Sequence, residues 1–310
     1  MTKTAIQWYL VIFKLLAGGG AGLLGFIGLA ELVGAKKRTD LIAIIVALAM
    51  IIIGGGLAVL WIGTPSVIMA AAANISKGSP ISLEFLACGL SVAVGVVYLF
   101  VERRENPVAG KVIGSAAILV ALAVGYMTGY SHQAMLGTTA WHTPTIPLGF
   151  LLEALLLGGF CYLAIAPRLA PRLALRAKEL PDDKSDDKLV NKLVDKCDDK
   201  KDTDKVFIWV LVVLAALAAV LALVHIFMVE LGSDLVLYVL LVLVIGAAGP
   251  LLLALGVLTK LVKPAPLWAL LGIVAALVGG LAFRAFVWVI VNPHLLSQID
   301  GLLTVNSLHL

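Results

Sequence analysis

Apolar residues along the chain are gathered into runs that are much longer than ordinary strands or surface helices. Eight of these runs are long enough to cross about 30 Å of hydrocarbon as a helix. Glycines, prolines and charge clusters separate them. The pattern predicts spans near residues 5–33, 41–61, 81–101, 111–130, 146–166, 206–229, 235–260 and 267–291. We therefore expect an all-α protein, a polytopic membrane bundle of eight transmembrane helices.

The composition supports a membrane protein. The chain is 61% hydrophobic and 14% charged, with a mean hydropathy of +1.07, which is outside the range of soluble domains. The first run is too long for the core of a signal peptide, and its basic cluster at 36–38 follows it, so we interpret it as a retained span. The three cysteines share no short spacing and predict neither a zinc nor an iron–sulfur site. We expect contact with membrane lipid and none with nucleic acid.

Basic residues in the connections predict the orientation. The protein has 23 Lys and Arg residues. Lys14 and Arg284 fall inside predicted spans, and Lys3 and Lys77 lie on one side of the membrane. All the others follow the first, third, fifth or seventh span, which the positive-inside rule places in the cytoplasm. Both termini are therefore expected outside, in a multi-pass protein of the cytoplasmic membrane. Four aromatic residues at outer span ends are expected to form an interfacial belt: Trp8, Tyr130, Trp141 and Trp288.

One long connection divides the chain. We expect helices one to five in residues 1–166, a cytoplasmic charged connection in 167–205, and helices six to eight with an outer C-terminal tail in 206–310. Asp182 to Lys205 is almost wholly Asp and Lys, broken by two apolar pairs at four-residue spacing. A short amphipathic helix fits these pairs. The insert is either a solvated linker, the reading we favour, or a docking site for a cytoplasmic partner.

A few charged residues lie well inside the spans: Lys14, Glu84, Glu153 and Arg284. At about 1.5 Å per residue, all four fall roughly 6–12 Å below the outer surface, and His225 falls at a similar level. Uncompensated charge in a membrane is costly, so we expect these groups to pair or to line a wet pocket. The alternatives are salt bridges that only hold helices together, snorkelling of the two cations, and a first-turn role for Glu84.

Two histidines are candidates for a chemical role. His142, in Trp141-His-Thr-Pro144, is a candidate for proton handling because an unperturbed histidine titrates near neutral pH. The alternative is an ordinary loop histidine. Only His225 lies clearly inside a predicted span, whereas a b-type haem takes two histidines from facing helices. We therefore expect no haem or metal in this chain.

Several short motifs resemble the membrane-anchor subunit of dimethyl sulfoxide reductase-type complexes (DmsC-type) and, more loosely, the NrfD-like quinol-handling subunits. They are found at the end of span two, at the starts of spans three and five, and in the last span. The segments are Gly63-Thr-Pro65, Ser82-Leu-Glu84, Tyr130, Trp141-His-Thr-Pro144, Pro147-Leu-Gly-Phe150, Leu155-Leu-Leu-Gly-Gly159 and Arg284-Ala-Phe-Val-Trp288.

The resemblance implies a subunit of an anaerobic molybdopterin oxidoreductase that oxidises menaquinol or another membrane quinol. Its electrons would pass to an iron–sulfur subunit and then to a molybdopterin catalytic subunit. Glu84 and His142 are then the candidates for proton transfer. Trp61 stands where the family has a histidine. The residues expected to bind quinol are Glu84, Arg284, Glu153, Trp61, Lys14 and His225.

Two other functions fit the same layout. A secondary transporter would use the buried charges as a substrate site, but the two halves show no internal similarity and no matching pair of broken helices. A purely structural tether would keep the eight helices and lose only the redox site.

Overall fold

The computed structural model describes residues 7–35, 40–64, 66, 69–70, 73–103, 107–134, 141–165, 187–229, 235–261 and 266–289. Within these ranges every regular element is helical. Eight of the described helical segments are long and apolar enough to cross a membrane. The expectation of an all-α bundle with eight spans is confirmed.

The first five spans are single helices. They are α1 (Trp8–Leu32), α2 (Asp40–Ile62), α4 (Pro80–Arg103), α5 (Pro107–Gln133) and α6 (Thr145–Ile165), with a 3₁₀ turn η1 (Ile75–Lys77) between α2 and α4. The helices α4 and α5 begin at a proline, whose fixed φ and missing N–H suit a first helical turn. For this reason α5 starts four residues before the apolar run that predicted it.

The last three spans contain α8 (Asp187–Met228), then α9 (Leu235–Tyr238), η5 (Val239–Ala248) and α10 (Gly249–Leu258) in one span, and finally α11 (Pro266–Val289). The segment η5 is a π-helix in which the Gly249 N–H bonds to the carbonyl of Val244, five residues back. Pro250 follows and lacks the N–H that would close a regular α-helical bond to Gly246. The apolar pattern alone predicted a plain helix here.

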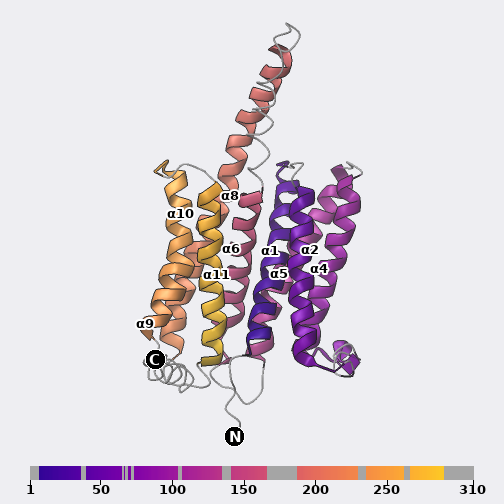
Figure 1. Ribbon diagram of the computed structural model, residues 1–310, viewed down its shortest axis with the longest axis vertical. Helices are drawn as coiled ribbons and strands as arrows, with labels where there is room; N and C mark the ends of the chain where they lie inside the picture. The colour runs from indigo at the N-terminus through magenta and orange to yellow at the C-terminus, as the bar shows by residue number, and fades with distance from the viewer. Residues whose placement is uncertain are drawn as a thin grey trace, which may run out of the picture.

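The helix α8 begins 19 residues earlier than the apolar run that predicted it. Residues 187–204 continue it as backbone helix, about 27 Å long at 1.5 Å per residue. Figure 1 shows this part of α8 projecting beyond the bundle. The start of the charged connection, residues 167–186, lies outside the described residues, as does the expected outer tail from residue 290. The division into 1–166, 167–205 and 206–310 stays a prediction.

The helix α1 lies in the middle of the bundle and packs against α2, α5 and α6 (Figure 1). On one side, α4 covers α5 and α2. On the other side, α6 joins α1 to α8 and α11, and η5 packs against α11. The chain therefore has two groups of helices, α2–α4–α5 and α8–η5–α10–α11, joined through α1 and α6.

Glycines allow α1 to approach its neighbours closely. A Cβ on Gly158 would collide with the backbone of Gly22, and one on Gly28 would collide with the carbonyl of Gly114. Backbones that approach this closely are stabilised by van der Waals contact between small residues. These glycines therefore serve close helix packing. Gly55 of α2 does not, because it has nothing within 4 Å of its Cβ position.

Replacing Gly158 by alanine is therefore expected to reduce accumulation of the protein in membranes at least several-fold. The added methyl group must push α6 away from α1, and overpacking of this kind typically costs about 1–3 kcal/mol. Gly55→Ala is the matched control, in open space on a helix, and is expected to be neutral or slightly stabilising. Immunoblotting of membranes compares the two. Equal accumulation of both variants would contradict the close contact between α1 and α6.

The two ends of the bundle are distinct, although the compartment that each faces is a prediction from the basic residues. Figure 1 places the starts of α1 and α4 and the end of α11 at one end, and the projecting part of α8 at the other. In a chain whose native cysteines are replaced, Ser76→Cys in η1 is expected to react with an impermeant maleimide in intact cells. Thr259→Cys, exposed after α10, is expected to react only after lysis. The opposite result would reverse the orientation.

Candidate functional site: a buried polar cluster within the bundle

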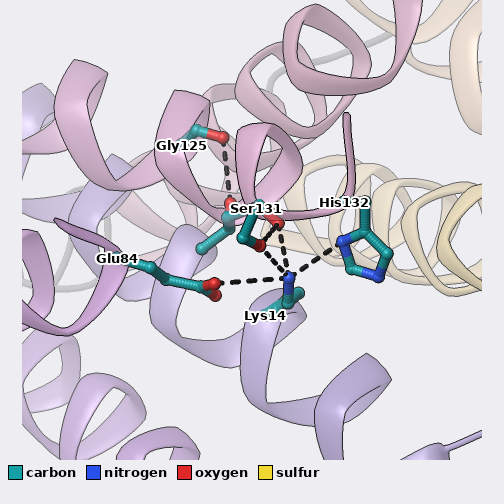
Figure 2. Close-up of polar contacts among 6 residues, drawn as sticks. Lys14, Glu84, Gly125, Ser131 and His132 are labelled. Atoms are coloured by element: carbon teal, nitrogen blue, oxygen red, sulfur yellow. Dashed lines mark hydrogen bonds and ion pairs between the residues drawn. The ribbon is translucent and has the colours of Figure 1, made fainter. Parts of the chain in front are cut away.

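Lys14 lies on the second turn of α1 and is the centre of a buried cluster. Its Nζ lies 2.8 Å from the carbonyl oxygen of Thr128, 2.5 Å from Ser131 Oγ and 2.9 Å from His132 Nδ1. It also lies 3.4 Å from Glu84 Oε2. An ammonium group has three donors, so four acceptors surround three N–H bonds. Figure 2 shows Lys14 with these partners converging on its Nζ.

Glu84 supplies the negative charge of this cluster. It lies on the second turn of α4, which starts at Pro80, and only 4% of its surface is exposed. One carboxylate oxygen pairs with Lys14, while Oε1 has no hydrogen-bond partner among the described residues. A buried carboxylate oxygen without a donor is unusual. Glu84 therefore has capacity to bind a further polar group.

One face of α5 completes the cluster. Thr128 and Ser131 are three residues apart, and His132 is four residues from Thr128, so all three side chains lie on the same side of the helix. The Thr128 hydroxyl donates to the Gly125 carbonyl at 2.9 Å (Figure 2). Because His132 Nδ1 receives a donor from Lys14, its proton belongs on Nε2.

Aromatic rings enclose His132. Its ring centroid lies 5.1 Å from Trp141, 5.7 Å from Trp288 and 5.7 Å from Phe150. The Trp141 indole N–H donates to the Val287 carbonyl and ties the start of α6 to the end of α11. Trp141 and Trp288 are thus buried. The expectation that these two belong to a lipid-facing belt is wrong for both, because they pack against a polar group inside the bundle.

Arg284 and Glu153 are two further buried charged residues. Arg284 is 1% exposed, donates from Nη1 to the Gly280 carbonyl at 2.9 Å, and stacks over Phe150 with Cζ 4.5 Å from the ring centroid. A Cβ on Gly280 would lie 3.1 Å from Arg284 Nη1 and 3.2 Å from Glu153 Oε2. Gly280 therefore leaves the space in which the two charged groups face each other. On the α1 side, Arg284 Nη2 lies beside Gly18.

His225 on α8 is fully buried and is fixed by the start of α6. Its Nδ1 lies 2.6 Å from Thr145 Oγ1, which lies 2.7 Å from Thr143 Oγ1. Its ring stacks on Tyr238 at 5.5 Å and meets Phe283 edge-on at 5.4 Å. Among the described residues, His225 Nε2 and the Tyr238 hydroxyl have no hydrogen-bond partner.

The structure thus brings together most of the residues that the sequence selected. Lys14 contacts Glu84, and Arg284 faces Glu153, as expected from two positive and two negative charges at one depth. His142 is different, because its side chain is exposed at the start of α6. The side chain of Trp61 lies outside the described residues.

Sequence reasoning did not select His132, Ser131 or Tyr238. The signal for the first two was present, since Thr128, Ser131 and His132 follow a helical spacing at the end of an apolar run. Nothing in the local pattern distinguishes Tyr238, which becomes significant only because α9 packs its ring against His225.

The described residues contain no group of three or more His, Cys, Asp or Glu side chains placed to hold a metal ion. The buried polar groups are instead hydrogen-bond donors and acceptors that suit an organic ligand or a proton.

Eight apolar helices with a buried Lys14–Glu84 ion pair define a multi-pass membrane protein with a polar site inside the bundle. The chain belongs to the DMSO reductase anchor subunit (DmsC) family, whose model matches residues 1–178, more than half of its length. The match includes Lys14, Glu84, His142 and Glu153, and ends before His225 and Arg284. No curated protein matches the chain.

Membership of this family makes the protein a membrane anchor subunit of a DMSO reductase-type complex. The family implies association with the catalytic and iron–sulfur subunits of such a complex, and it is consistent with an interaction between this chain and quinol. The resemblance inferred from the motifs around Glu84 and Trp141 is confirmed.

Proposed function

We propose that this anchor subunit binds membrane quinol, oxidises it, and passes its electrons to the iron–sulfur subunit of the complex. From there the electrons reach the molybdopterin catalytic subunit, which passes them to the terminal acceptor. The observation that supports this most strongly is the buried Lys14–Glu84 pair, whose carboxylate keeps one oxygen without a partner. Quinol oxidation releases two protons and two electrons, and it requires a base beside the ring.

Glu84 is the proton acceptor in this proposal. Lys14 has its three donors directed at groups of the protein, so it has none left for a ligand and acts as a positioning residue. Its charge favours the ionised form of Glu84, which is the form that accepts a proton. His132 stands on the opposite side of Lys14 from Glu84 (Figure 2) and accepts a hydrogen bond from the Lys14 ammonium, so it helps to hold Lys14 in place.

Arg284 borders this cluster through α1, and Glu153 and His225 lie beyond Arg284 on the α6 and α8 side. His142, exposed at the outer end of α6, is placed to exchange protons with water. With the orientation predicted from the basic residues, the site lies near the outer face of the cytoplasmic membrane, and both termini lie outside. Trp61 is included among the proposed quinol-binding residues only because it lies at the end of α2.

The direct test is quinol oxidation by membranes that contain the complete complex. Reduced menadione is expected to be oxidised in the presence of the terminal acceptor, and membranes that lack this chain are expected to be inactive with it. A dye that reduces the catalytic subunit directly controls for the soluble partners. A structural tether predicts dye-linked turnover without quinol-linked turnover, and a transporter predicts no co-purifying redox subunits; either result would overturn the proposal.

A further inference from the structure

A chain of hydrogen bonds connects His225, inside the bundle, with the end of the bundle at which α6 begins. His225 Nδ1 lies 2.6 Å from Thr145 Oγ1, which lies 2.7 Å from Thr143 Oγ1. Thr143 Oγ1 in turn lies 3.7 Å from the sulfur of Met228. His225 is fully buried, whereas Met228 is 55% exposed and the residues on either side of Thr143 are exposed. The chain therefore runs from the interior of the bundle to its surface.

The donors in this chain can be assigned. A thioether sulfur only accepts, so the Thr143 hydroxyl donates to Met228. Thr143 then accepts from the Thr145 hydroxyl, and Thr145 accepts from the N–H of His225 Nδ1. The opposite order leaves the Met228 sulfur without a donor and puts an N–H on the buried His225 Nε2, which has no acceptor among the described residues. The first order makes the additional hydrogen bond, and all its donors point outward.

In this order His225 Nε2 is a buried nitrogen with a lone pair and no partner among the described residues. The ring is held in place, because it stacks on Tyr238 at 5.5 Å and meets Phe283 edge-on at 5.4 Å. A neutral imidazole binds a proton at its bare nitrogen and can release one from the other nitrogen. A proton that arrives at Nε2 therefore allows Nδ1 to pass its own proton to Thr145.

We propose that His225, Thr145 and Thr143 form a proton-exit path from the buried polar layer to the end of the bundle at which α6 begins. The path rests on the proposed function, in which the oxidation of one quinol releases two protons and Glu84 accepts one of them. The other proton reaches His225 from the layer that contains Glu153. The Phe283 ring contacts His225 and also lines the small space beside Glu153, which has room for about one water molecule.

One proton enters the path and one leaves it. The entering proton binds His225 Nε2, and Nδ1 passes its proton to Thr145 Oγ1. Thr145 passes its hydroxyl proton to Thr143, and Thr143 releases its own hydroxyl proton to water beside Met228. No electron moves along this chain. The hydroxyls return to their starting positions by rotation, and the imidazole returns by exchange of its proton between the two ring nitrogens.

The first experiment examines the resting chain and does not depend on quinol. The full chain with isotope-labelled histidine is reconstituted in lipid vesicles, and nitrogen NMR distinguishes protonated from bare ring nitrogens. The His225 signal is assigned by its absence from His225→Gln, or by its shift in Thr145→Val if the first variant does not accumulate. We expect a neutral ring with the proton on Nδ1. A proton on Nε2 beside a bare Nδ1 would overturn the proposal.

The second experiment measures the path in the complete complex. Thr145→Val keeps the shape of the side chain and removes its hydroxyl, while Thr145→Ser is the matched control that keeps the hydroxyl. Reduced menadione is mixed with the oxidised complex in weak buffer, and a pH-indicator dye follows proton release during one turnover. Thr145→Val is expected to slow the release about tenfold and to enlarge the solvent deuterium isotope effect, whereas Thr145→Ser stays within about twofold of wild type.

Equal rates of proton release in the valine and serine variants would overturn the path, because a purely structural role of Thr145 does not distinguish a hydroxyl from a methyl group in this way. A slower release in Thr145→Val without a larger isotope effect would also contradict it. A wild-type complex that reduced menadione does not reduce would overturn the proposed function. The NMR experiment would still decide the order of the hydrogen bonds in that case.

Discussion

Lys14→Met is expected to lower the accumulation of the protein in membranes to less than about a fifth of wild type. The substitution keeps the length of the side chain and removes its charge. Glu84 then remains buried without its cation, and Ser131 and His132 lose a donor. Removing one partner of a buried ion pair typically costs about 3–5 kcal/mol. Losses of 1–2 kcal/mol already change protein abundance several-fold.

The measurement is immunoblotting of membranes together with the melting temperature in detergent. Lys77→Met is the matched control, because Lys77 is exposed in η1, and it is expected to behave as wild type. Adding Glu84→Gln to Lys14→Met is expected to restore part of the lost stability, since the unpaired charge is removed. If Lys14→Met accumulates normally and melts like wild type, the buried cluster does not hold α1, α4 and α5 together.

The sequence predicted the bundle well because membrane spans depend on one strong property. A run of apolar residues long enough to cross the bilayer must be helical, since no water is present to satisfy the backbone. The π-helix η5 was not predictable in the same way, because its segment is uniformly apolar and only Pro250 marks it.

The charged residues of the site were predictable from the sequence, whereas the polar residues that contact them were not. Lys14, Glu84, Glu153 and Arg284 stood out because charge is rare and costly in such sequence. Depth along each helix further suggested that they would meet. Which charged residues contact each other depends on how each helix is rotated about its own axis. No local sequence pattern records that rotation.

Polar partners of ordinary appearance were missed for the same reason. Ser131 and His132 at the end of α5 resemble residues of a helix end, and become part of a site only because α1 presents Lys14 to them. Trp141 and Trp288 resembled interfacial residues, yet they enclose His132. An apolar span end gives the same sequence signal whether it faces lipid or another helix.

Glu84→Gln has the second of the two largest expected effects. Glutamine keeps the shape of the side chain, while it cannot accept a proton at neutral pH. Lys14 retains the Thr128 carbonyl, Ser131 and His132 as acceptors, so the variant is expected to fold and to assemble. A positioned general base typically contributes about 10²–10⁴-fold in rate. We therefore expect quinol-linked turnover to fall about 100-fold or more.

The matched control is Glu31→Gln. Glu31 is also a buried carboxylate on α1, but it lies at the other end of that helix, beside Gly110 of α5. This variant is expected to retain quinol-linked turnover within about twofold. A parallel loss in both variants would indicate a general effect of removing buried charge.

The rate at which reduced menadione reduces the iron–sulfur centres of the purified complex tests the central claim most directly. In the Glu84→Gln complex we predict that this rate falls about 100-fold or more, while reduction by a dye that bypasses the anchor is unchanged and all subunits co-purify. Wild-type reduction by quinol in that variant would contradict the assignment of Glu84 as the proton acceptor.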